Sequence, residues 1–133
     1  MMKNLFTAVV ALLVAGPSVS AHHSFAAEYD GTKPVKVTGV VRRVEWANPH
    51  IWFYVEGRDE VTGRTAVWGF SAAPPGMLAR RGITKDALKI GDTIQVEGFL
   101  AKDGSANASG GRVTFADGRQ VFTASAEDSV PKP

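Results

Sequence analysis

The sequence predicts a mainly β fold, a small OB-like five-stranded barrel with a short helical connection between strands 3 and 4. Two observations lead to this fold class. Apolar residues alternate with a period of two in several short segments, and a proline-rich segment with helical features separates the third of these from the fourth. A small β-sandwich is the alternative that the same order of elements allows. The expected strands are residues 35–46, 51–56, 64–71, 93–100, 112–116 and 119–122.

The first expected strand changes face part-way along its length. Its valines up to Val41 lie on one parity, whereas Val44 and Trp46 lie on the other. One extra residue near Arg42 and Arg43, in a β-bulge, produces such a change. Long, bulged first strands that serve two sheets suit small closed barrels.

The second expected strand is apolar on both faces. One face carries Ile51, Phe53 and Val55, and the other carries Trp52 and Tyr54. Because side chains alternate between the two faces of a strand, one set faces the core and the other faces outward. We therefore expect Trp52 or Tyr54 at the surface.

After the third strand the pattern changes to that of a short helix. Pro74-Pro75 can start this helix, Gly82 can end it, and Thr84 can begin a further turn. Residues 102–111 are mostly small or polar and are expected to form a flexible loop.

Asp117-Gly118 predicts a two-residue hairpin turn between the last two strands.

Residues 1–21 are predicted to be a signal peptide. Lys3 precedes an apolar run of about eleven residues, and small or apolar residues at Val19 and Ala21 suit a peptidase that cuts before His22. The apolar run is shorter than the ~20 residues that a membrane-spanning helix needs. We therefore expect a periplasmic or secreted protein with no membrane span after cleavage.

The rest of the chain divides into three parts. Residues 22–34 are expected to form an N-terminal arm that Phe25 and Tyr29 anchor to the body. Residues 35–123 form the OB-like β-barrel domain, and residues 124–133 a flexible tail.

Composition excludes several function classes. There is no cysteine, so disulfides, thiolate metal sites, thiol catalysis and a lipid anchor are all excluded. The net charge is only +2, which does not give the excess of positive charge that proteins use to bind the phosphates of nucleic acid. The expected partner is an unidentified small ligand, a metal ion or an envelope protein.

The three histidines suggest a metal site. If cleavage follows Ala21, the new α-amine and the His22 imidazole can chelate one ion, and His50 can complete a three-nitrogen set. Nitrogen ligands of this kind suit copper(II), so copper is the expected cofactor, with His23 as a further ligand. The alternative is that His22 and His23 are simply solvated and that His50 only forms a hydrogen bond in a turn.

Aromatic residues form a second candidate site. Trp46, Trp52, Tyr54 and Trp68 can line a barrel face that binds a flat ligand or a protein partner. Packing into the core is the alternative for each of them.

No catalytic set is evident. Ser24 lies beside His23, but sequence neighbours do not make a catalytic triad, and there is no G-x-S-x-G motif. We expect a binding protein and not an enzyme.

Three segments carry a family resemblance: H-H-S-F-A-A-E-Y-D at residues 22–30, V-E-W-A-N-P-H-I-W at 44–52, and L-K-I-G-D-T-I-Q-V-E-G-F at 88–99. The chain resembles a family of small exported bacterial proteins classed as a domain of unknown function. The resemblance implies export and a single β-rich domain, and it implies no activity. The histidines that could bind a metal fall within the first two segments.

Overall fold

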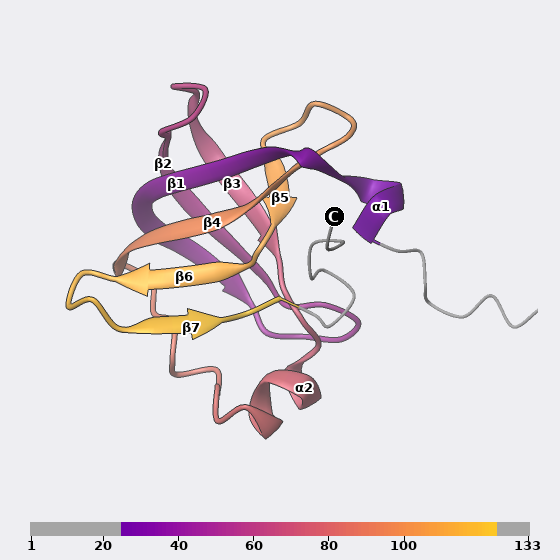
Figure 1. The fold of residues 1–133 in the computed structure, drawn as a ribbon. Helices are drawn as coiled ribbons and strands as arrows, with labels where there is room; N and C mark the ends of the chain where they lie inside the picture. The colour runs from indigo at the N-terminus through magenta and orange to yellow at the C-terminus, as the bar shows by residue number, and fades with distance from the viewer. Residues whose placement is uncertain (1–24, 125–133) are drawn as a thin grey trace, which may run out of the picture.

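Seven strands form one hydrogen-bonded sheet in the computed structural model, which describes residues 25–124 (Figure 1). This confirms the mainly β class and the short helix between the third and fourth strands. The elements are α1 (Phe25–Glu28), β1 (Tyr29–Glu45), β2 (Trp52–Asp59), β3 (Thr65–Ser71), α2 (Pro75–Arg80), β4 (Thr93–Ala101), β5 (Asn107–Ser109), β6 (Arg112–Phe115) and β7 (Gln120–Phe122).

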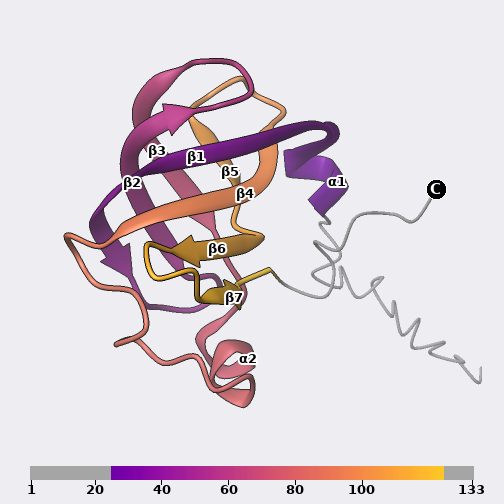
Figure 2. The same ribbon diagram turned by 60° about the vertical axis from the view of Figure 1, so that its left-hand side comes forward.

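Strand β1 is long enough to serve two neighbours. It pairs antiparallel with β4 through Val40 and with β2 through Glu45, and the register with β2 shifts between Val41 and Arg43. The predicted bulge is thus confirmed. Because the sheet order is β1-β2-β3-β5-β4-β6-β7 and β1 also pairs with β4, the pairings of five strands close into a ring (Figure 2).

The ring closes through a short strand that the sequence pattern does not predict. Residues 102–111 were expected to be a loop, but β5 lies within them and pairs in parallel with Gly69–Ser71. Its three residues, Asn-Ala-Ser, are too short and too small to show an alternating pattern, so their strand conformation comes from the neighbouring strands. The sheet has seven strands where six were expected, and five of them form the ring: β1, β2, β3, β5 and β4. The predicted hairpin is confirmed, but its turn has three residues, 116–118, and not two, because Phe115 pairs with Arg119. Gly118 ends the turn at φ 87°.

The hydrophobic core fills the inside of the ring. The Phe53 and Phe70 rings lie 5.3 Å apart there, and Trp68 is 1% exposed. Burying each such side chain contributes about 1.5–3 kcal/mol of transfer free energy. The largest fully buried side chains are Trp68, Phe53, Phe70, Ile51, Leu78, Ile94, Val37, Val41, Val55, Val96 and Val113.

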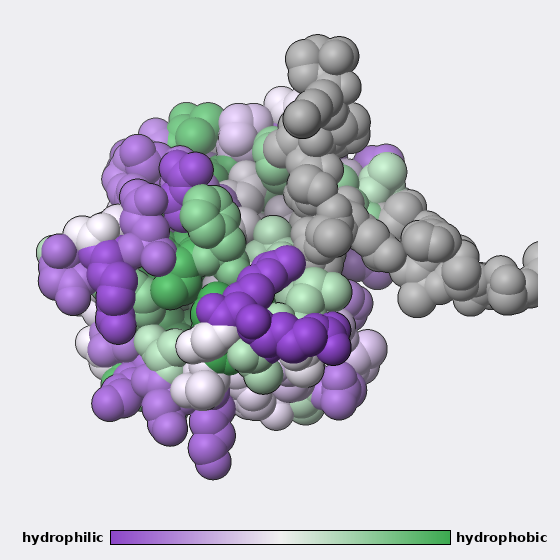
Figure 3. Space-filling model, turned by 60° about the horizontal axis from the view of Figure 1, so that its bottom comes forward, coloured by the Kyte–Doolittle hydropathy of each residue, from purple (hydrophilic) through white to green (hydrophobic). Residues whose placement is uncertain are grey.

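One end of the ring is closed by α2 and the segment that follows it. Leu78 is buried, and Ile83 and Leu88 pack on the core around an apolar void of about 20 Å³. Figure 3 views this end and shows apolar side chains gathered among hydrophilic ones. The Arg81 guanidinium donates a hydrogen bond of 2.6 Å to the Ala124 carbonyl, so the end of the described chain is held against α2.

At the start of the described chain, α1 and the beginning of β1 pack on the outside of the ring. Phe25 and Tyr29 are buried with Ala101 and Phe99 in a second, smaller cluster, which confirms both as anchors. The Phe25 and Phe99 rings meet edge to face at 5.5 Å. Strand β1 begins at Tyr29, six residues before the expected start, because this part of the chain pairs with the end of β4.

The predicted signal peptide, His22, His23 and nearly all of the predicted tail lie outside the described residues. Within residues 25–124, no helix is long and apolar enough to cross a membrane.

Candidate functional site

His50 is the one predicted metal ligand that the structure describes. It lies exposed in the loop between β1 and β2, just after the cis peptide bond between Asn48 and Pro49. Its Nδ1 lies 3.0 Å from the carbonyl oxygen of Ala72. A carbonyl oxygen can only accept a hydrogen bond, so Nδ1 carries the proton in the neutral ring and the lone pair is on Nε2.

The backbone around His50 is fixed on both sides of this hydrogen bond. The neighbouring side chain, Ile51, is 2% exposed and anchors the loop in the core. The amide of Ala72 donates to the Ile51 carbonyl at 2.8 Å, next to the carbonyl that accepts from His50. The orientation of the imidazole is therefore set by the fold and not by a flexible loop.

Within residues 25–124, no group of three histidine, cysteine or carboxylate side chains is placed to hold a metal ion. His50 would need ligands from outside this range, and the sequence offers His22 and His23 as the histidines that could supply them.

The four aromatic residues of the second predicted site do not share one face. Trp52 and Tyr54 are half-buried on the outside of β2, with their rings 6.4 Å apart and 22° from parallel. The Arg43 guanidinium lies over the Tyr54 ring, 4.9 Å from its centroid. Trp46 instead packs on the core beside the closed end, and Trp68 is in the core. Only Trp52 and Tyr54 are thus available on an outer face.

Trp52 also lines a hollow of about 630 Å³ that no sequence pattern predicts. Three separate parts of the chain form it: the α1–β1 junction, the start of β2, and the end of β4 with the loop that leads to β5. The lining residues are Ala27, Glu28, Tyr29, Trp52, Ala101, Lys102, Asp103 and Asn107. No spacing or motif brings these positions together, so only the register of the strands reveals them.

The wall formed by α1 is tied to the end of β4. The Lys102 amide donates to the Glu28 carbonyl at 2.8 Å, and the Lys102 ammonium donates to the Ala26 carbonyl. With the Phe25 cluster behind it, this wall is held by both hydrogen bonds and apolar packing.

The hollow carries negative charge at neutral pH. Hydrogen bonds from the Ser105 hydroxyl and amide to Asp103 lower the pKa of this carboxyl below its ordinary value. Glu28 supplies a second, exposed carboxylate, and Lys102 supplies one positive charge. Carboxylate and amide oxygens therefore outnumber cations among the lining side chains.

Comparison with known proteins identifies the family. The model of a family of unknown function, DUF6152, matches residues 10–111. The chain belongs to this family. No curated protein and no solved structure matches the chain. The predicted membership of a family of unknown function is thus confirmed, and the family supplies no activity.

Proposed function

We propose that the protein is an exported, non-enzymatic binding protein that holds copper(II), or another divalent metal, through His22 and His50, with His23 as a further ligand. The observation that carries this proposal is the hydrogen bond between His50 Nδ1 and the Ala72 carbonyl. It leaves Nε2 as the coordinating atom of an exposed imidazole.

This arrangement is the one that metal-ligating histidines use. Such residues nearly always donate their second ring N–H to a carbonyl or a carboxylate, which fixes the tautomer and orients the ring. Here the acceptor belongs to the backbone of the segment after β3, 22 residues away in the sequence.

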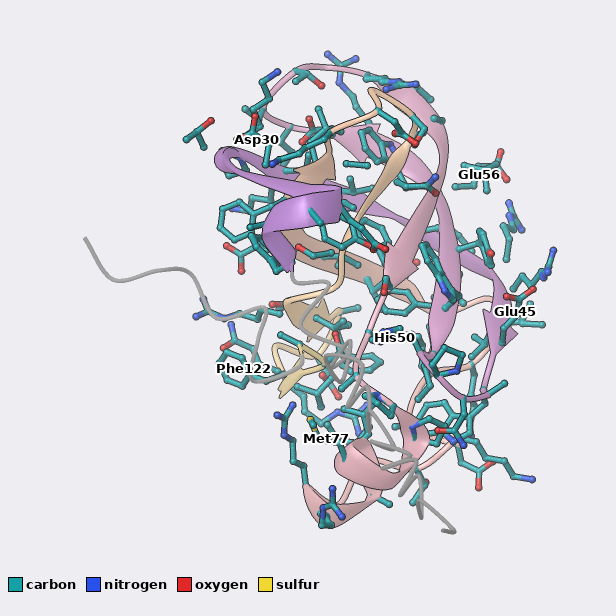
Figure 4. The ribbon with its side chains drawn as sticks, turned by 90° about the vertical axis from the view of Figure 1, so that its right-hand side faces the viewer. Asp30, Glu45, His50, Glu56, Met77 and Phe122 are labelled. Carbon is teal, nitrogen blue, oxygen red and sulfur yellow. The ribbon has the colours of Figure 1, made fainter. Side chains whose placement is uncertain are left out.

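The position of α1 supports a shared site. Helix α1 and Trp52, which is two residues after His50, line the same hollow, and Figure 4 shows His50 on the side of the molecule that carries α1. His22 is three residues before Phe25, so its α-carbon can reach at most about 10 Å from that anchor.

The chemistry of the ligand set favours copper(II). An α-amine and two imidazoles are nitrogen donors, for which copper(II) has the highest affinity of the divalent first-row metals. All three must be neutral to bind, so the affinity is expected to fall as the pH drops below about 7. Periplasmic or secreted localisation follows from the predicted leader and is part of the same proposal.

We also infer that the five-strand ring is an OB-like barrel. The closed cycle of pairings, the long bulged first strand and the helix between β3 and β4 support this assignment.

Copper titration of the processed protein tests the metal site. His22→Ala and His50→Ala are each expected to weaken copper(II) binding by about tenfold or more, because each removes one nitrogen ligand. Asn48→Ala changes the same loop without removing a ligand, so it should bind like the parent. Electron paramagnetic resonance of the bound ion should show fewer nitrogen couplings in both histidine variants. Unchanged affinity in His50→Ala would contradict the proposal.

A second candidate function is supported by a different observation. Trp52 and Tyr54 form an aromatic pair on the outside of β2, which suits a ligand- or protein-interaction module that needs no metal. If the protein binds no metal, this function takes its place.

A further inference from the structure

We propose that the hollow between α1, β2 and the loop after β4 is a binding site for an uncharged saccharide. The inference does not depend on the metal site. It assigns a class of ligand to the aromatic surface of β2. The evidence for it is the size, the aromatic wall and the polar lining of the hollow.

The size of the hollow suits a small ligand. Its volume of about 630 Å³ falls within the ~300–1,000 Å³ that is typical of small-molecule sites. A mono- or disaccharide fits such a volume, whereas a folded partner would need a broader surface.

Trp52 provides one wall of the hollow. Its side chain is half-buried, its ring is stacked beside that of Tyr54, and the residue lines the hollow. The apolar C–H face of a pyranose ring can lie flat against such an indole, which removes both surfaces from water.

The polar lining suits hydroxyl groups. Glu28, Asp103 and Asn107 offer carboxylate or amide oxygens that accept hydrogen bonds from sugar hydroxyls. The same two carboxylates repel phosphate, and the ammonium of Lys102 already donates to the Ala26 carbonyl. The hollow offers an aromatic ring on which a nucleotide base could stack, but not the positive charge that its phosphate would need. The lining therefore favours an uncharged ligand.

The glycine at position 69 makes room for Asn107, which lines the hollow, and for Tyr54, which stacks beside Trp52. A side chain there would begin 2.5 Å from Asn107 Oδ1 and 3.3 Å from Tyr54 Cε1, so only glycine lets these groups lie over β3. The Asn107 amide is also held by a 2.9 Å hydrogen bond from its Nδ2 to the Ser105 hydroxyl. Asn107 is therefore positioned before any ligand arrives.

Nuclear magnetic resonance of the processed protein in EDTA tests the proposal, with maltose, cellobiose and N,N′-diacetylchitobiose as probes. The three tryptophans give three indole N–H signals, which single Trp→Phe variants assign. At least one disaccharide should shift the Trp52 signal saturably and leave the signal of buried Trp68 in place. Adenosine monophosphate, a flat but anionic probe, should shift neither.

Variants separate this site from the metal site. Trp52→Ala should weaken disaccharide binding by about tenfold or more, a loss of about 1.4 kcal/mol, and Trp52→Phe by less because it keeps a ring. Val67→Ala, at an exposed position of β3 that does not line the hollow, and His50→Ala should both bind like the parent. The proposal is overturned if no disaccharide shifts the Trp52 signal, if Trp52→Ala binds as tightly as the parent, or if the nucleotide binds more tightly than the sugars.

Discussion

Both faces of β2 and β3 carry large apolar side chains, but their surroundings differ. On the inner face, Phe53, Val55 and Trp68 are at most 1% exposed. On the outer face, Trp52 and Tyr54 are half-buried and Val67 is 55% exposed. The inner side chains account for stability because they are removed from water, whereas the outer ones leave apolar surface exposed to solvent. The comparison shows that an aromatic residue in a small β protein cannot be assigned a role from its type alone.

Trp68→Ala should have the largest effect on stability, a loss of about 3–5 kcal/mol, because it leaves a cavity in the core. Urea denaturation followed by circular dichroism measures the free energy of unfolding. Trp68→Phe should cost clearly less, because the indole N–H that it removes is buried and, among the described residues, has no hydrogen-bond partner. Equal losses in the two variants would show that the core does not depend on the volume at this position.

Asp59 is the last inner residue of β2, and its effect should come next. Its carboxylate is fully buried and accepts hydrogen bonds from the hairpin and from β1. Asp59→Ala leaves these donors without their acceptor, so we expect a loss of roughly 2–3 kcal/mol at neutral pH, measured by urea denaturation. The donors are the amides of Lys36, Val61 and Thr62 and the Thr62 hydroxyl, at 2.6–3.2 Å.

The contribution of Asp59 should depend on pH. Burial by itself raises the pKa of Asp59, but the hydrogen bonds to its carboxylate outweigh burial and hold the pKa below its ordinary value. A carboxyl with a lowered folded-state pKa stabilises the protein above its unfolded pKa of about 4, and the stabilisation is lost as the pH falls through the folded pKa. The difference in unfolding free energy between parent and Asp59→Asn should therefore shrink below about pH 4. A constant difference from pH 7 to pH 3 would show that the charge of Asp59 does not matter.

Gly69→Ala tests the outer face at the point where Tyr54 and Asn107 cover β3. The new methyl group must displace Asn107 Oδ1, so we expect a loss of about 1 kcal/mol in thermal or urea unfolding. Gly76→Ala is the matched control, because Gly76 lies in α2 and has no atom within 4 Å of an added methyl group. That control should be neutral or stabilising by up to about 1 kcal/mol, since alanine favours helix. A larger loss at Gly76 than at Gly69 would contradict the packing described for β3.

Trp52→Ala should have the smallest effect on stability, below about 1 kcal/mol, because its ring is only half-buried and fills no core volume. The same unfolding measurement, set beside Trp68→Ala, makes the comparison between the two faces quantitative. A loss as large as that of Trp68→Ala would assign Trp52 to the core.

Much of the fold could be predicted because local signals agreed with it. The change of parity after Val41 indicated the bulge, Pro74-Pro75 and Gly82 marked the helix, and Asp117-Gly118 marked the last turn. Strand β5 could not be predicted, because Asn107, Ala108 and Ser109 become a strand only through pairing with β3 and β4.

The candidate site was only partly predictable. The histidines and the outward-facing Trp52 followed from residue type and alternation. The hydrogen bond from His50 to Ala72 joins segments 22 residues apart, and the hollow joins α1 to residues of β2, β4 and β5. Such groupings depend on strand register, which alternation within one strand does not specify.

The shortness of β5 has a consequence for the motions of the molecule. Its seam with β3 holds only three residue pairs, and its seam with β4 holds one, whereas β1 pairs with β4 over eight. Local opening favours the least paired part of a sheet, so the amides of Gly69 and Gly110, which cross this seam, are expected to exchange with solvent hydrogen sooner than those between β1 and β4. Asn107 is both the first residue of β5 and part of the wall of the hollow. A ligand that contacts Asn107 would therefore stabilise the pairing of β5 with β3. It would slow hydrogen exchange at the Gly69 and Gly110 amides without contacting them.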